Sequence, residues 1–217
     1  VLIVVLLLTP NVCHAVLIQG DGLLGDFSAD VVYQTTNSTT ATLTVVLTNI
    51  SNIANGGFIT AFAFNNPFNS ISVVSLTASN PAFSLLGGPS FNNGINGMPS
   101  GYFDIGASTG GSFEGGGNPN AGLGVGETGT FTFTLTGVGL DALTLDDFLS
   151  ELSSQQGGSS QEFLSVRFRG FLNGGSDKVP GHYDLPPSPI TEPNTFLLLA
   201  SALTGFCFRR KFTKAGS

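Results

Sequence analysis

Three segments of the chain alternate between apolar and polar residues, and this period of two most constrains the fold. The clearest is TFTFTLT at residues 130–136, where three large apolar side chains alternate with four threonines. Residues 42–48 (TLTVVLT) and 163–171 (FLSVRFRGF) follow the same pattern. Because successive side chains of a strand point to opposite faces, the pattern predicts half-buried antiparallel strands.

Further strands are predicted at residues 29–34, 58–64, 71–77 and 101–105. Residues 58–64 are apolar on both faces, so we expect this strand to be central in its sheet. Seven or eight strands separated by Gly, Asn and Pro turns predict a mainly β fold, a two-sheet antiparallel β-sandwich. We place this domain at residues 16–185.

One short helix interrupts the strands, at residues 143–152. Thr144 is its expected N-cap, and Asp147 three residues later completes a capping box with Asp in the Glu position. We expect one apolar face to lie over an open end of the sandwich, formed by Leu145, Phe148, Leu149 and Leu152. Residues 108–129 hold nine glycines and predict a long surface loop.

Charge is scarce and unevenly distributed. Only 10% of residues are charged, and the formal net charge is −7. Four of the seven basic residues lie in the last nine positions, whereas all fourteen acids precede them, so the chain before this tail carries 3 − 14 = −11. Such an acidic body repels phosphate backbones, which excludes nucleic acid as an expected partner.

The histidines and cysteines are too few and too badly placed for the common catalytic constellations. Cys13, His14 and Cys207 lie in the end segments, and His182 stands in the linker region. A Ser-His-Asp or Cys-His site and a zinc or copper site are therefore not expected. The glycine runs lack the Lys-Ser/Thr of a phosphate-binding loop. We expect no enzyme activity, no cofactor and no metal site.

Carboxylates leave two alternatives open. Asp141, Asp146 and Asp147 cluster at the helix start, where capping and the helix dipole explain them. These three residues, or a second set of carboxylates, could bind a calcium ion. Two of them could also act as the acid pair of a glycoside hydrolase. The second set is Asp104, Glu114 and Glu127. Without Trp and with three Tyr, a sugar-stacking cleft has few platforms.

The three basic residues of the body are assigned structural roles. Arg167 and Arg169 share one strand face and are expected to pair with acids on that face or in the loop. Lys178 is expected to form an exposed turn pair with Asp177.

The first fifteen residues have the layout of a secretion signal. An aliphatic run at residues 1–8 is followed by a break and by small residues, Cys13 and Ala15, at the −3 and −1 positions of a cleavage site. No Met or basic segment precedes the run, so we expect a signal peptide truncated at its start.

The other end has three parts. Residues 186–195 form a Pro-rich linker, residues 196–208 (FLLLASALTGFCF) an apolar helix, and residues 209–217 a basic tail. Thirteen helical residues reach about 20 Å, short of a full bilayer core. Arg209, Arg210 and Lys211 are expected to fix the orientation, with the C-terminus in the cytoplasm and the body outside.

These terminal residues resemble the PEP-CTERM sorting signal of exported proteins from Gram-negative bacteria that make extracellular polysaccharide. The matching residues are Glu192, Pro193 and Thr195, followed by the apolar run and the Arg cluster. Thr191 stands where the usual motif has its first Pro. The resemblance implies processing by an exosortase, transient anchoring in the inner membrane, and a mature protein in the cell envelope or matrix.

Three stretches of the body look, more loosely, like β-sandwich proteins that carry this signal: residues 49–51 (NIS), 62–65 (FAFN) and 176–181 (SDKVPG). We therefore expect an exported structural or adhesive protein that can contact extracellular polysaccharide. The alternative is a carbohydrate-binding module, with or without calcium.

Overall fold

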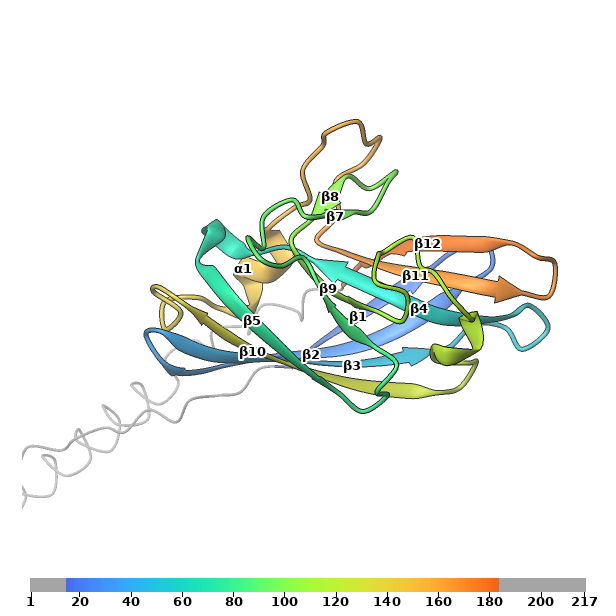
Figure 1. Cartoon of the computed structure of the whole chain (residues 1–217), viewed down its shortest axis with the longest axis horizontal. Helices are drawn as coiled ribbons and strands as arrows, with labels where there is room; N and C mark the ends of the chain where they lie inside the picture. Colours follow the sequence, from blue (N-terminus) through green and yellow to red (C-terminus); the bar gives the residue numbers. More distant parts are fainter. Residues whose placement is uncertain (1–14, 184–217) are drawn as a thin grey trace, which may run out of the picture. The chain divides into compact units, whose positions relative to one another are not determined.

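The computed structural model describes residues 15–183 and shows a mainly β protein (Figure 1). The described residues form twelve strands, two 3₁₀ turns and one α-helix. The strands are β1 (Ala15–Asp21), β2 (Asp26–Asn37), β3 (Thr40–Asn49), β4 (Gly56–Phe64), β5 (Ile71–Ala78), β6 (Ser84–Leu86), β7 (Ile95–Asn96), β8 (Tyr102–Phe103), β9 (Ile105–Ser108), β10 (Thr128–Gly137), β11 (Leu164–Phe171) and β12 (Ser176–Pro180). The helical elements are η1 (Pro67–Asn69), η2 (Pro119–Ala121) and α1 (Leu145–Ser150).

Two five-stranded sheets form the body. Sheet A has the order β1-β2-β3-β10-β5, and sheet B has the order β12-β11-β4-β9-β6. A small third sheet pairs β7 with β8. All strand pairs among the described residues are antiparallel. The mainly β class with antiparallel sheets and one short helix is thus confirmed, and β4 is central in its sheet as expected.

The structure has more strands than were predicted, and one predicted strand is divided into two. The predicted strand at residues 101–105 is split into β8 and β9, because Asp104 lies between them. Strands β1, β6, β7 and β12 were not predicted. Three of these have five residues or fewer, too short for an alternating pattern to stand out. In β1 the exposed Leu17 hides the alternation.

The two sheets face each other across one hydrophobic core that is rich in phenylalanine. The Phe62 ring of sheet B lies 4.7 Å from the Phe131 ring of sheet A, measured between centroids, in an edge-to-face contact. Phe64 meets Phe133 at 5.1 Å in the same way. In Figure 1 the sheets form the lower and upper layers of the molecule. The threonines that alternate with these rings therefore point outward from sheet A.

Helix α1 closes one end of the core, as predicted. The Asp147 carboxylate accepts hydrogen bonds from the backbone N–H (2.7 Å) and the hydroxyl (2.8 Å) of Thr144, which fixes the helix start. Its buried residues Leu145, Phe148 and Leu149 pack between the sheets. Leu152 does not share this face, because the helix ends at Ser150; it is 49% exposed.

The outer faces of the two sheets differ. Sheet B carries a second, smaller apolar cluster on its outer side, where Ala61 and Ala63 of β4 meet Phe103 and Phe113. Two segments cover the outer side of sheet B: the excursion between β6 and β9 (residues 87–104) and the glycine-rich loop between β9 and β10 (residues 109–127). On sheet A the outward residues of β3 and β10 stay partly or fully exposed.

His182 is part of the folded body, so its placement in the linker region was wrong. Its backbone exchanges two hydrogen bonds with Gln19 of β1, at 2.9 and 2.8 Å. The chain thereby passes from β12 of sheet B to the edge of sheet A. The His182 side chain lies 3.9 Å from the Asp21 carboxylate.

Candidate functional site

The outward side of sheet A presents hydroxyl groups in transverse rows. The register places Thr44, Thr132 and Thr77 in one row and Thr42, Thr134 and Ser75 in the next. We call this surface the hydroxyl face. Its members lie on β3, β10 and β5: Thr40, Thr42, Thr44, Thr48, Ser75, Thr77, Thr128, Thr130, Thr132, Thr134 and Thr136.

The hydroxyl face is uncharged. Strands β3, β10 and β5 contain no charged residue, whereas the acids of sheet A lie on β1 and β2. Thr48 and Thr128 share a hydrogen bond of 2.9 Å between their hydroxyls, which links β3 and β10 within one row. Val46 and Val73 place methyl groups among the hydroxyls. The face thus offers donors, acceptors and methyl groups but no fixed charge.

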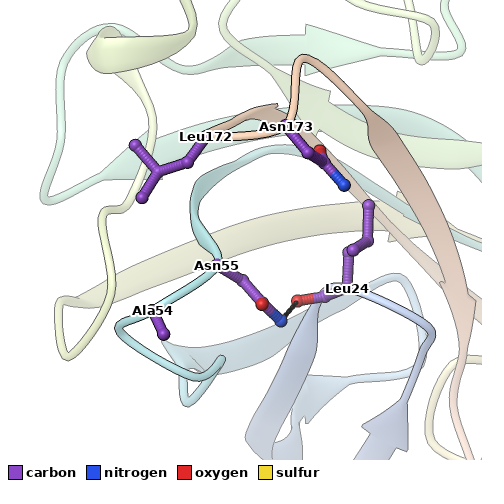
Figure 2. A pocket seen from close by; sticks show the side chains of 5 residues that line it. All are labelled: Leu24, Ala54, Asn55, Leu172 and Asn173. Carbon is purple, nitrogen blue, oxygen red and sulfur yellow. Dashed lines mark hydrogen bonds between the residues drawn. The ribbon is translucent and has the colours of Figure 1, made fainter.

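A pocket of about 300 Å³ lies at the end of the body formed by the β1–β2, β3–β4 and β11–β12 turns (Figure 2). It is lined by Leu24, Ala54, Asn55, Leu172 and Asn173. Asn55 donates a hydrogen bond to the Leu24 carbonyl (3.0 Å), which joins two of the turns. Leu24 and Asn173 point toward each other across the pocket in Figure 2.

Exposed apolar side chains lie on the same three turns. Leu23 is 95% exposed, Ile53 83% and Leu172 79%. Leu172 also lines the pocket, whereas Leu23 and Ile53 are next in sequence to the lining residues Leu24 and Ala54. The Oδ1 atom of Asn173 accepts the N–H of Gly175 (2.8 Å), so its amide nitrogen is oriented as a donor. The pocket combines aliphatic walls with neutral amide groups.

The three basic residues of the body gather on sheet B under the glycine-rich loop. Arg167 and Lys178 are direct cross-strand partners. Glu114 of the loop forms a salt bridge with Lys178 and lies 3.7 Å from the guanidinium of Arg167. Arg169 donates to the Gly116 carbonyl (3.2 Å). The expected pairing with an acid is therefore found for Arg167, while Arg169 contacts the loop backbone.

The expected turn pair between Lys178 and Asp177 is wrong. The Lys178 side chain is only 14% exposed, and its ammonium donates to Glu114 and to the Met98 carbonyl. The Asp177 carboxylate instead accepts the backbone N–H of Leu24 (2.9 Å). Adjacent residues of a strand point to opposite faces, so the two side chains of the pair separate.

Burial lowers the pKa of Arg167, and the nearby Glu114 carboxylate opposes this shift. The group stays cationic, since an arginine remains charged far above neutral pH. Its Nε atom is buried without a hydrogen-bond partner. The cluster holds the glycine-rich loop onto sheet B. The side chains of Arg167 and Lys178 are both largely shielded from solvent.

Most of the candidate carboxylates have structural partners. Residues 15–183 contain no group of three His, Cys, Asp or Glu side chains placed to hold a metal ion. Glu114 is engaged by Lys178, and Glu127 accepts the N–H of Gly124 (2.7 Å) within its own turn. Asp141 and Asp146 stay at the exposed start of α1. The described residues therefore offer no group of this kind for a calcium ion.

Asp104 has a structural position instead. It is 8% exposed and accepts the backbone N–H groups of Asn66 (2.8 Å) and Asn93. Burial raises the pKa of its carboxyl, and the two backbone hydrogen bonds partly oppose the shift. The residue ties the excursion before β9 to the end of β4.

Sequence reasoning missed the roles of three buried asparagines. Asn49 donates to the carbonyls of Gly57 (3.2 Å) and Leu123 (3.0 Å), and Asn66 donates to those of Ile71 and Phe91. Asn65 donates to two carbonyls beyond α1. Asn49 and Asn65 belong to the NIS and FAFN stretches noted in the sequence, but only their burial reveals that they hold loops together.

The predicted sorting residues lie outside the described part of the chain. These are Glu192, Pro193, Thr195, Arg209, Arg210 and Lys211. The predicted signal segment lies outside it except for its last residue, Ala15, which opens β1. Within residues 15–183 no helix has the length and apolar character needed to cross a membrane.

The chain matches no protein-family model, and no curated protein is similar to it in sequence.

Proposed function

We propose that the chain is an exported, non-enzymatic protein of the bacterial cell surface or extracellular matrix with a structural or adhesive role. The observation that carries the proposal is the hydroxyl face of sheet A. The outer face of an antiparallel sheet is commonly open to water and polar, whereas on sheet B the loop and the chain between β6 and β9 cover it. On sheet A, β3, β10 and β5 remain open and uncharged.

The chemistry of the hydroxyl face suits neutral polysaccharide. Sugar hydroxyls exchange hydrogen bonds with threonine hydroxyls, and sugar C–H groups lie against methyl groups such as those of Val46. Each hydrogen bond contributes only about 0.5–1.5 kcal/mol net. Binding at one sugar is therefore weak, and a long polymer gains affinity by touching several rows at once.

The first experiment is sedimentation of the full chain with insoluble polysaccharides of different charge. A neutral β-glucan should carry the protein into the pellet, and an alginate gel should not, because the acidic body repels its carboxylates. If the β-glucan and the alginate retained the protein equally, or if neither retained it, the result would contradict the proposed contact surface.

Export and sorting form the second part of the proposal, and the sequence alone supports them. The apolar run of residues 196–208 is short for a bilayer span, so the Arg209–Lys211 cluster must contribute to retention. An exosortase would recognise Glu192 and Pro193, and the protein would remain in the inner membrane until it is processed.

Sorting is tested by the double change Glu192→Ala and Pro193→Ala. The unprocessed precursor should accumulate in the membrane fraction, and Asn194→Ala serves as the matched control. Release of the double variant at the wild-type rate would mean that the tail is a plain membrane anchor. Neutral residues in place of Arg209, Arg210 and Lys211 should instead loosen the tail and reduce processing.

The pocket of Figure 2 favours a second candidate function, that of a carbohydrate-binding module. Its aliphatic walls and neutral amides fit one uncharged sugar that bears an acetyl or methyl group. Asn173→Asp keeps the acceptor for Gly175 and removes the amide donor. On a glycan array this variant should lose the ligand if the pocket binds it and retain it if the hydroxyl face does.

The calcium-assisted form of the carbohydrate-binding module is tested by the melting temperature of the protein, measured with and without calcium.

A further inference from the structure

The edge strands of the two sheets are protected unequally. Sheet B ends at β6, which has three residues, and at β12, which contains Asp177, Lys178 and Pro180. Sheet A ends at β1, whose Gln19 is paired with His182. Proteins usually prevent edge-to-edge pairing by keeping the edge strand short, by placing charged residues or proline on it, or by covering it with another segment. Three of the four edges therefore carry such protection.

The fourth edge, β5, has none of these devices. Its sequence ISVVSLTA is eight residues long, with two valines and an isoleucine and neither charge nor proline. Within residues 15–183, β5 pairs only with β10. Such a strand is a template for addition of another strand.

The register shows which backbone groups are available. Ser79 donates its N–H to the Thr130 carbonyl (2.9 Å), directly after the end of β5. Hydrogen-bonded and non-bonded pairs alternate along an antiparallel ladder. The backbone groups of Ala78, Leu76 and Val74 therefore point away from β10, toward the open edge.

The distribution of charge favours a second copy of the chain as the partner. Residues 31–103, which include β3 to β8, contain no charged residue. The acids of the sheets lie on the opposite side of the body, on β1, β2 and β12. Two copies that approach along β5 therefore bring together strands without charge, although the body as a whole is strongly acidic. An antiparallel pair of identical strands is also compatible with a twofold axis, the commonest symmetry of dimers.

We propose that β5 pairs with β5 of a second copy in an antiparallel arrangement, which joins the two A sheets into one continuous sheet. The partner strand covers the half-buried Leu76 and satisfies the outward backbone groups of Val74, Leu76 and Ala78. It also places two hydroxyl faces side by side, which strengthens contact with a long polymer. The pairing itself requires no ligand, so it stands independently of the proposed polysaccharide contact.

Amide hydrogen exchange on the wild-type full chain tests the pairing directly. The N–H groups of Val74, Leu76 and Ala78 should be protected at high protein concentration and exchange faster on dilution. The N–H of Thr77, which bonds within the sheet, should remain protected throughout. Fast exchange of the three edge amides at every concentration would overturn the proposal.

A charge placed on the edge gives the second test, with a matched control on the opposite edge of the same sheet. Val73 is 56% exposed and Leu17 on β1 is 51% exposed. Val73→Lys should weaken dimerisation about tenfold or more, because it places a charge on an edge strand that is otherwise uncharged. Leu17→Lys should leave the dimer unchanged in analytical ultracentrifugation. A monomeric wild type, or equal effects of both lysines, would contradict the assignment.

Discussion

The outer face of sheet A is open and that of sheet B is covered, and their strands differ accordingly: β10 alternates between polar and apolar residues, whereas β4 is apolar on both faces. On sheet B, β4 has small outward residues, Ala61 and Ala63, which leave room for Phe113 of the glycine-rich loop. On sheet A, β10 presents threonine at every outward position. Small apolar residues leave room for other side chains to pack on the sheet. Threonine hydroxyls instead form hydrogen bonds with water, so the face they form is stable in solvent.

This difference separates stability from function. The cover of sheet B contains buried rings, a partly buried ion pair and a buried carboxyl, so changes there should act on the free energy of unfolding. The hydroxyl face of sheet A contributes little buried area, so changes there should act on binding. Four predictions follow this division, from the largest effect to the smallest.

Removal of the ring that covers sheet B should have the largest effect. Phe113 is 2% exposed and stacks on Phe103 with 6.2 Å between ring centroids. Phe113→Ala should lower the free energy of unfolding by about 3–5 kcal/mol, measured by urea denaturation. Phe68→Ala is the control, because Phe68 is 71% exposed. Similar losses for the two variants would mean that the loop does not pack on sheet B.

The ion pair beneath the loop should have the next largest effect. Glu114→Gln leaves the Lys178 ammonium and the Arg167 guanidinium without their carboxylate. Because Glu114 is itself half exposed, the loss of stability should be about 1–2 kcal/mol. Glu162→Gln, in a partly exposed residue near β11, should change stability by less than about 0.5 kcal/mol. A neutral result for Glu114→Gln would show that the cluster does not hold the loop.

Asp104 should make a smaller, pH-dependent contribution. The folded protein raises the pKa of this carboxyl above 3.8, so the folded state holds its proton to higher pH than the unfolded state does. The contribution of Asp104 to stability is then greatest below pH 3.8 and declines as the pH rises through the folded pKa. Asp104→Asn should remove this decline from the stability profile, and Asp30→Asn, in an exposed residue, should retain it. Identical profiles for wild type and Asp104→Asn would refute the assignment.

On the hydroxyl face the effect on stability should be smallest. Thr134 is exposed and pairs with Thr42 and Ser75. Thr134→Val keeps the β-branched shape and should change the free energy of unfolding by less than about 0.5 kcal/mol. A loss comparable to that of Phe113→Ala would mean that this face is not a free surface.

The alternating segments predicted the sheets well because each carries its own signal. Residues 42–48 and 130–136 lie within β3 and β10, and their apolar residues form the core. The helix and its cap were likewise predictable, since Thr144 and Asp147 are close in sequence.

Contacts between distant segments could not be predicted in the same way. Lys178 lies next to Asp177 in sequence but pairs with Glu114, because the loop folds back over sheet B. The bonds of Asn66 and the pocket around Asn55 also depend on turns that meet only in the folded protein. The exposed face that the threonines occupy followed from the alternation, but the segments that cover sheet B did not.

The most direct test of the functional role of the hydroxyl face is sedimentation with neutral β-glucan after a fourfold substitution. Thr42, Thr44, Thr132 and Thr134 occupy two adjacent rows on β3 and β10. Replacement of all four by Val, which removes the hydroxyls and keeps the shape, should abolish retention while the protein remains folded by circular dichroism. Replacement of all four by Ser, which keeps the hydroxyls, should preserve it. Wild-type retention of the valine variant would contradict the assignment of this face as the contact surface.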